Sequence, residues 1–261
     1  MLLLRHMKAK SFCRALAAAL LAGAMQLSVA TLSAQESIAS LTAAAKKNNA
    51  DAQYKLGLAY QTGDQVPMSF DDAINWFKKA ARQNHAQAQL ALGFCYANGI
   101  GAKADWREAF NWFKKAAEQD LADAQFKTGF CYYKGLGTTL NEAEALKWFS
   151  KAADQGSLAA QHQAAEIHYE LKNYQEAYKL FRKAALRGMP EAMYRLGGFH
   201  LLGQGGAERD MVEAHKWFIL ALPLGRDEPG KLREKMATLY RMTPEQIAKS
   251  FELAKAFKPQ P

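Results

Sequence analysis

The sequence predicts an all-α protein built from stacked helix pairs. A nine-residue segment, AFNWFKKAA at 109–117, recurs in close copies at 73–81, 145–153 and 177–185 and in a weaker copy at 214–222. In each copy the apolar residues fall at positions i, i+3, i+4, i+7 and i+8, which places them on one face of a helix. Five copies of one amphipathic helix indicate a repeat protein.

The residues before each copy predict where these helices begin. A polar residue stands four positions before the first Ala of every copy, and an acidic residue follows it three positions later. The polar residues are Ser69, Asp105, Asn141, Asn173 and Asp210. In a capping box, the first side chain accepts a hydrogen bond from a free backbone N–H, and the acid accepts one from the N-cap backbone. We therefore expect five capping boxes.

The spacing divides the repeats into five units of two helices each. Their bounds are 50–85, 86–121, 122–157, 158–189 and 190–226. The first helix of a unit carries Leu-Gly-x-x-Tyr or a variant of it. A Gly inside a helix costs about 1 kcal/mol relative to Ala, so its recurrence suggests that the two helices approach closely. Gly-x-Gly loops, which end most of the first helices, are interpreted as turns rather than phosphate-binding loops.

Both ends of the repeats predict capping helices. Residues 35–49 match only the second half of a unit, and such a piece can close the open end of a stack. Residues 227–261 should form closing helices, the second of which has Thr243 at the N-cap, Pro244 at N1 and Gln246 at N3. The last unit has apolar residues where the others have Lys, and these closing helices should cover them.

The amino terminus has the features of a secretory signal. Arg5, Lys8, Lys10 and Arg14 precede an apolar run, 15–30, which small residues follow. We predict a signal peptide over residues 1–34, with cleavage after Ala30 or Ala34. An uncleaved membrane anchor is the alternative, but the run is shorter than the roughly 20 apolar residues that a spanning helix needs.

Removal of this segment changes the charge and the cysteine count. It holds four Lys or Arg and no acid, so the net charge falls from +9 to +5, which is mildly basic and not typical of a nucleic-acid-binding protein. Cys95 and Cys131 remain, at the same position of adjacent units. Equivalent positions of stacked helix pairs usually lie farther apart than the Cα limit of about 7 Å for a disulfide. We expect two free, buried thiols.

The repeated motif identifies a family resemblance. The pattern A-x-A-x-x-x-L-G-x-x-Y-x-x-G-x-G, followed by A-x-x-W-F-x-K-A-A, covers about residues 40–226 and resembles the Sel-1-like branch of tetratricopeptide-type repeats. The resemblance implies a right-handed αα-superhelix, a solenoid, that serves as a protein-binding scaffold. Such proteins are commonly secreted or associated with the bacterial envelope. With the predicted signal, this implies a periplasmic or secreted protein.

The motifs of common enzymes are absent from the sequence. It contains no His-Glu-x-x-His, Gly-x-Ser-x-Gly or Cys-x-x-Cys, so we predict no enzyme, no cofactor and no metal site. His162 and Glu166 lie one helical turn apart, and His168 and His200 share a position of neighbouring units, but a structural zinc site needs four converging ligands. The two latter residues are interpreted as replacements for the packing Tyr.

A cell-envelope enzyme, or a glycan- or peptidoglycan-associated protein, is the alternative function. Some cysteine-rich relatives have been associated with penicillin binding, which would imply a β-lactam-interacting protein. Those relatives carry a disulfide in each repeat, whereas this chain has one Cys in each of two units and no Ser-x-x-Lys box. We therefore favour the scaffold.

The resemblance also implies that the first helices line a concave groove, which would bind a protein or peptide rather than nucleic acid. The candidate partner-binding residues are Tyr54, Leu58, Phe94, Phe126, Lys127, Phe130, Tyr133, Lys134, His162, Glu166, Tyr169, Tyr194 and Arg195. Aromatic residues interleaved with bases are typical of interface hot spots. The alternative is that some of them fill space between successive first helices.

The second helices carry a different set of residues. Their Lys residues should form a solvated convex face, with an envelope polyanion as the alternative partner. They are Lys78, Lys79, Lys114, Lys115, Lys151 and Lys183. On the opposite face, Trp112 is expected to fill a core site of the second unit.

We predict that the exported protein begins at Thr31 or Gln35, because a leader peptidase cleaves after the small residues that follow the apolar run. The intact mass of protein recovered from the exported fraction measures this directly. Exported protein that retains Met1 would contradict the prediction.

Overall fold

The computed structural model describes residues 37–222 and 240–260, and the regular structure of this part is entirely α-helical. Its helices are α2 (Ile38–Lys46), α3 (Ala50–Thr62), α4 (Phe70–Arg82), α5 (Ala86–Asn98), α6 (Trp106–Ala117), α7 (Ala122–Lys134), α8 (Glu142–Asp154), α9 (Leu158–Glu170), α10 (Tyr174–Leu186), α11 (Pro190–Leu202), α12 (Met211–Ala221) and α14 (Pro244–Ala256). The expected fold class is confirmed. Of the two predicted closing helices, the first falls on residues outside the described part.

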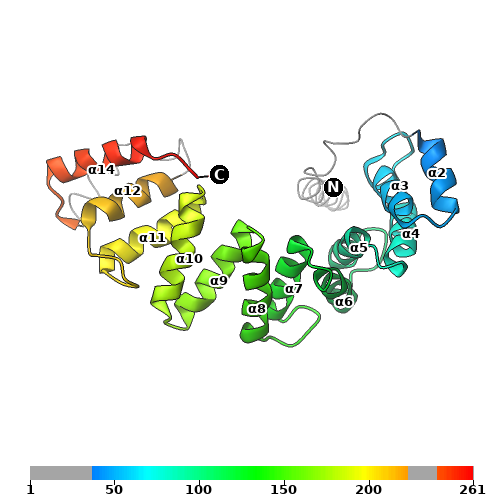
Figure 1. Cartoon of the computed structure of the whole chain (residues 1–261), viewed down its shortest axis with the longest axis horizontal. Coiled ribbons are helices and arrows are strands. Elements are labelled where there is room, and N and C mark those ends of the chain that lie inside the picture. Colours follow the sequence, from blue (N-terminus) through cyan, green and yellow to red (C-terminus); the bar gives the residue numbers. More distant parts are fainter. Residues whose placement is uncertain (1–36, 223–239, 261) are drawn as a thin grey trace, which may run out of the picture. The chain divides into compact units, whose positions relative to one another are not determined.

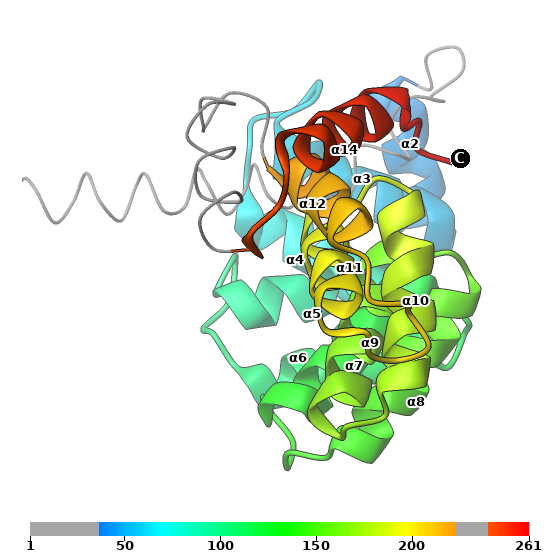
Figure 2. The ribbon, with the colours of Figure 1, turned by 90° about the vertical axis from the view of Figure 1, so that its left-hand side faces the viewer.

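The described residues form two compact units, which we call the amino-terminal and carboxyl-terminal units. The first extends to Cys131 and includes Gly135–Thr139, and the second comprises Tyr132–Lys134 and the chain from Leu140 onward. In the amino-terminal unit, α2 packs on α3, α3 on α4, α4 on α5 and α5 on α6 (Figure 1). The carboxyl-terminal unit continues the same pattern from α8 to α12 and ends with α14 on α12 (Figure 2). Within each unit these helices therefore pack on their sequence neighbours, as in a repeat protein.

Four of the five predicted N-caps form, but the reciprocal half of the predicted capping box does not. The Ser69, Asp105, Asn141 and Asp210 side chains accept from backbone N–H groups of the following turn, whereas Asn173 makes no such bond. The N-cap N–H groups donate instead to carbonyls of the first helix, for example Ser69 to Tyr60 at 2.9 Å. Because that N–H already has a partner, the acid has nothing to accept. The predicted capping box at Thr243 and Gln246 is complete.

The recurrent Gly allows the second helix to approach the first. A Cβ atom placed on Gly57 would lie 2.6 Å from the Phe77 ring, and one on Gly197 would lie 2.7 Å from the Phe218 ring. The close approach predicted from the sequence is confirmed. A second close approach occurs in the loops, where a Cβ on Gly101 would collide with the backbone carbonyl of Phe70 at the start of the preceding unit's second helix. The loop thus requires a residue without a side chain.

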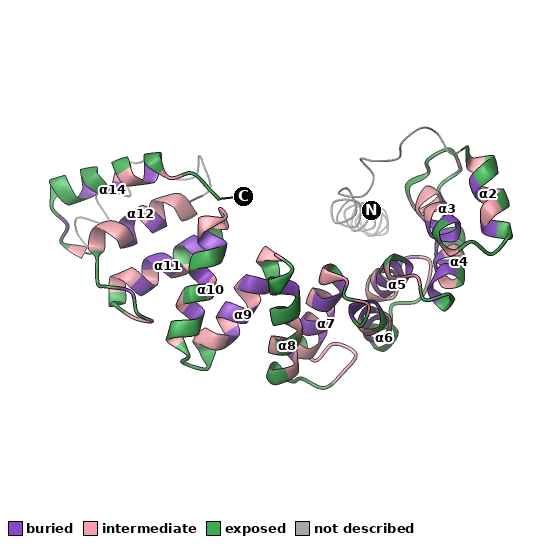
Figure 3. Cartoon of the chain, in the orientation of Figure 1, coloured by how far each residue is buried: buried purple, intermediate pink, exposed green. Residues whose placement is uncertain are grey.

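In the first three Trp-Phe pairs the Phe, rather than the Trp, fills the core, whereas in the last pair Trp217 is buried and Phe218 is half-buried. Phe77, Phe113 and Phe149 are at most 2% exposed, whereas Trp112 is only half-buried. Figure 3 shows buried positions in the second helices α4, α6 and α8, to which these residues belong. The Lys115 ammonium lies over the Trp112 ring, 4.5 Å from its centroid. Trp112 was expected to fill a core site, but it packs at the edge of the amino-terminal core as a half-buried residue. Both aromatics lie on the apolar face, but only the Phe is directed at the space that the Gly leaves.

A ladder of buried Gln residues, which the sequence analysis missed, links successive turns. Gln53 donates to the Ala45 carbonyl at 3.1 Å and accepts from Gln83 at 2.7 Å. Gln89 makes the equivalent bonds to Ala81 and Gln119. In the carboxyl-terminal unit, Arg187 stands at the position of Gln83 and Gln119. It donates a hydrogen bond to the Gly156 carbonyl at 2.8 Å instead. These bonds satisfy polar groups that the turns would otherwise bury without partners.

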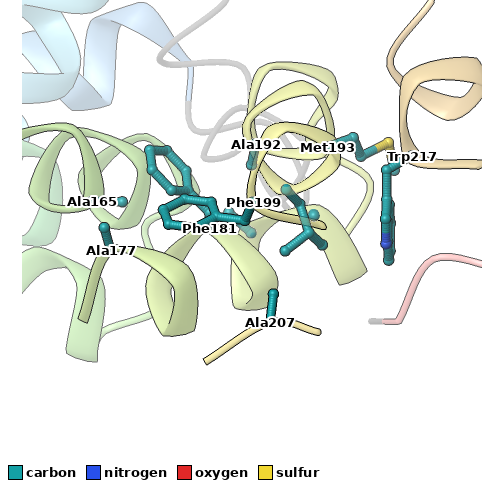
Figure 4. Close-up of a cluster of buried hydrophobic side chains, with 11 residues drawn as sticks. Ala165, Ala177, Phe181, Ala192, Met193, Phe199, Ala207 and Trp217 are labelled. Carbon is teal, nitrogen blue, oxygen red and sulfur yellow. The ribbon is translucent and has the colours of Figure 1, made fainter. Parts of the chain in front are cut away.

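The core of the carboxyl-terminal unit combines large rings with small residues. Figure 4 shows Phe181 of α10 beside Phe199 of α11, with their ring centroids 6.0 Å apart. Ala165 of α9 and Ala177 of α10 belong to the same core, and their small side chains let α9 and α10 approach. The chain end closes this core, since the Phe257 ring lies edge-on to Trp217 at 5.5 Å. The prediction that the tail covers the last unit is confirmed for α14 and this segment.

A buried His–Ser pair joins α12 to α14. His215 and Ser250 are both fully buried, and His215 Nδ1 lies 2.7 Å from Ser250 Oγ. Ser250 donates its hydroxyl hydrogen to the Ile247 carbonyl at 2.6 Å, so its oxygen accepts from the Nδ1–H of a neutral imidazole. Burial lowers the pKa of His215 to about 4.

We predict that this pair makes stability depend on pH. The folded-state pKa of His215 lies below its ordinary value of 6.5, so protons bind preferentially to the unfolded chain. The contribution of neutral His215 to the free energy of unfolding is complete above pH 6.5. It declines as the pH falls towards 4, by up to about 3 kcal/mol. Urea unfolding at pH 7.5 and 4.5 measures this loss. His215→Gln should be less stable at pH 7.5 but should lose less on acidification, and an equal loss in both proteins would contradict the assignment.

Candidate functional site

Three aromatic rings and one Lys gather on the first helices of the amino-terminal unit. Phe94 belongs to α5, and Phe126, Lys127 and Phe130 belong to α7. The Lys127 Nζ atom lies 5.1 Å from the centroid of the Phe94 ring and 5.4 Å from that of Phe126. Phe126 stacks on Phe130 with a centroid distance of 6.4 Å. We call these four residues the Lys127 cluster.

The buried core supports the cluster, yet its rings are partly exposed to solvent. Phe94 lies edge-on to the buried Phe113, with 5.4 Å between ring centroids. All four side chains are half-buried. Rings fixed by a rigid core lose little conformational freedom when a partner covers them, so the cluster is preorganised for binding.

Lys127 is the unusual group of this cluster. Burial lowers the pKa of its ammonium, and this effect is partly opposed by the negative charge of Asp123 on the same helix. None of the carboxylates in the described part of the chain lies within ion-pair distance of its Nζ atom. The ring faces of Phe94 and Phe126 stabilise the cation in part, and its capacity for hydrogen bonds to an anion is unused.

The first helices of the carboxyl-terminal unit have charges that pair with one another. Arg195 on α11 binds Glu166 on α9 through two hydrogen bonds, Nε to Oε1 at 2.8 Å and Nη2 to Oε2 at 2.6 Å. His162 Nε2 approaches the same carboxylate at 3.4 Å. The guanidinium also lies over the Tyr169 ring, 5.0 Å from its centroid. These four candidates come together, but as an internal network joining two helices.

The remaining candidates differ in how far they are available to a partner. Tyr54 is 8% exposed and its ring packs 4.9 Å from that of His85, so it belongs to the core and not to a binding surface. Leu58 packs at the edge of the same core. Tyr133 binds Glu170 through its hydroxyl at 3.3 Å, with the Lys134 ammonium over its ring. Tyr194 is 63% exposed.

The Lys residues of the second helices are not uniformly solvated. Lys79, Lys115, Lys151 and Lys183 are exposed, whereas Lys78 and Lys114 are partly covered. Lys79, Lys115 and Lys151 each lie over the Trp three residues earlier, at 3.7, 4.5 and 4.6 Å from the ring centroids. Cation–π pairs at exposed positions contribute about 0.5–1 kcal/mol each. These Lys residues thus shield the half-buried Trp rings.

The thiols and the histidines do not form a metal site in the described ranges. Cys95 and Cys131 are free and buried, as expected, and burial raises the pKa of each thiol to about 12. Between residues 37 and 222 and between 240 and 260, no three His, Cys, Asp or Glu side chains are grouped as metal ligands. No helix in these ranges is long and apolar enough to cross a membrane.

We predict that Arg195→Met lowers the free energy of unfolding by about 1–2 kcal/mol, since Glu166 is only 15% exposed and would lose its main partner. Arg182→Met provides the matched control, because Arg182 is exposed on α10 and makes no ion pair with the described residues. Urea denaturation measures both variants. Equal stability of the two would show that the Arg195–Glu166 pair contributes nothing.

Comparison with known proteins agrees with this architecture. The Sel1 repeat family matches residues 50–85, 86–121, 122–157, 159–189 and 190–222. A Sel1 repeat protein from Oxalobacter formigenes is 30% identical, with a TM-score of 0.64 over 82% of this chain and 88% of that protein. A protective antigen of uropathogenic Escherichia coli with an SLR fold is 28% identical, with a TM-score of 0.73 over 84% of this chain.

The two relatives differ in length, since this chain spans 48% of the Escherichia coli antigen. No curated protein matches the chain. The family repeats cover most of the sequence, and their bounds agree with the helix pairs of the structure. The chain belongs to the Sel1 repeat family.

Proposed function

We propose that this chain is an exported scaffold that binds a partner protein or peptide through the first helices of its amino-terminal unit. The observation that carries the proposal is the Lys127 cluster, in which three rings and an ammonium without a carboxylate partner among the described residues lie half-exposed on adjacent first helices. A fixed aromatic patch with a base at its centre has the composition of an interface hot spot.

The contrast between the two units supports this choice of surface. In the carboxyl-terminal unit, Arg195 and Glu166 satisfy each other, so a partner would have to break an existing pair to use either charge. The amino-terminal unit imposes no such cost at Lys127. Binding energy is gained most readily where groups are ordered but not already paired.

Export and the scaffold role rest on separate observations. The predicted signal peptide, residues 1–34, supports export to the periplasm or beyond, and it lies outside the described residues. Sel1 repeat proteins are in general non-catalytic scaffolds, which fits a chain whose recurrent features all serve helix packing. A partner would then be another protein of the same compartment.

We predict that Phe126→Ala combined with Phe130→Ala weakens partner capture by about tenfold or more, because hot-spot aromatics each contribute about 2 kcal/mol or more to binding. Photo-crosslinking in a periplasmic extract would identify the partner, and biolayer interferometry with the purified partner would measure the change. Met68→Ala with Trp106→Ala is the control, because it removes exposed apolar side chains of the same unit outside its first helices.

The two double variants must keep the helicity and melting temperature of the wild-type protein for the comparison to hold. Loss of capture only in the Phe126 and Phe130 variant supports the proposal. Wild-type capture by that folded variant would place binding elsewhere and overturn it. Unfolding of the variant would assign both rings to the core, with the same consequence.

A further inference from the structure

Three first helices carry a base at the same position, two residues before the recurrent Gly. These bases are Lys55, Lys127 and Arg195. Lys55 pairs with Asp51 at 2.8 Å, and Arg195 pairs with Glu166 at 2.6 Å. Within the described residues, Lys127 is the one base of the three for which no carboxylate partner is found. Lys55 and Arg195 thus show that a base at this position can pair with a carboxylate.

The residue that faces the base explains the difference between Arg195 and Lys127. Glu166 lies one position after the residue that replaces the recurrent Gly in its unit, and the equivalent residue in the second unit is Phe94. Arg195 contacts Glu166 of the preceding unit. At the equivalent positions, Lys127 contacts the Phe94 ring of its own preceding unit. A phenyl ring stabilises a cation through its face, but it accepts no charge-assisted hydrogen bond.

We propose that Lys127 binds a carboxylate of the partner, from an Asp or Glu side chain flanked by apolar residues that pack on Phe94 and Phe130. This inference rests on the proposed function and specifies the chemistry of the partner. The carboxylate would take the place relative to Lys127 that Glu166 takes relative to Arg195. The flanking apolar residues follow from the rings on both sides of the ammonium.

The electrostatics of the amino-terminal unit favour an anionic group at this point. Lys127 is half-buried, so an ion pair formed there is less screened by solvent than a fully exposed one. Its ammonium has lost hydration through burial, which lowers its pKa, and a bound carboxylate would raise that pKa again. Asp123 is exposed and lies beyond ion-pair distance of Nζ, so it does not occupy the position.

The test uses two fluorescein-labelled peptides, Ser-Leu-Phe-Glu-Phe-Leu-Ser and the same peptide with Gln in place of Glu. Fluorescence anisotropy measures their binding to the mature chain, to Lys127→Gln and to Lys55→Gln. The wild-type protein should bind the Glu peptide about tenfold more tightly than the Gln peptide, because a carboxylate completes the ion pair. Lys127→Gln should lose this preference.

Lys55→Gln is the matched control, since it removes the same charge at the equivalent position but from a base that is already paired. It should retain the preference, and Lys127→Arg should retain it as well. Melting temperatures establish that the variants fold.

Equal binding of the two peptides to the wild-type protein, absence of binding, or a preference that survives in Lys127→Gln would overturn the inference. The proposed function is tested separately through the Phe126 and Phe130 variant. If that variant loses partner capture while Lys127→Gln retains it, the proposed scaffold function is supported and the proposed carboxylate site at Lys127 is contradicted.

Discussion

The ring of a second-helix Phe packed on a first-helix Gly sets the spacing within a helix pair, and other features follow from it. At Gly57 a side chain as small as a methyl group would collide with the Phe77 ring. Because the Phe fills this space, the adjacent Trp is displaced to the edge of the pair, where a Lys covers it. The contact also fixes which face of the first helix is buried and which face remains available for polar or aromatic residues.

The sequence predicted the helix pairs because the apolar period and the N-cap residues are local signals. It did not distinguish Phe113 from Trp112 as the core residue, since both lie on the same apolar face and only the shape of the neighbouring helix decides between them. The failed capping boxes have a similar cause. The Ser69 N–H is satisfied by Tyr60, nine residues earlier, and no rule based on the adjacent turn anticipates that bond.

The sequence predicted which candidate residues lie on the first helices, but not which of them pair with one another. The sequence placed Lys127, Glu166 and Arg195 on the first helices as equal candidates, whereas the structure pairs the last two across 29 residues. The register of successive repeats brings residue 94 towards 127 and residue 166 towards 195. Repeat proteins permit this variation because each unit contacts only its neighbours, so a change at one contact leaves the remaining units intact.

Among the described residues, Lys127 is half-buried without a carboxylate partner, and burial of a cation in this way opposes folding. The chain already contains the stabilising alternative, since an acid at residue 94 would give the arrangement of Glu166 and Arg195. Phe94 instead leaves a half-buried cation whose burial is offset by ring faces and by the negative charge of Asp123 on the same helix. Binding sites commonly retain groups that are less stable alone than in complex, because the unsatisfied interaction becomes binding free energy when the partner supplies it. The half-buried ammonium of Lys127 is therefore the group that a carboxylate-bearing partner would engage.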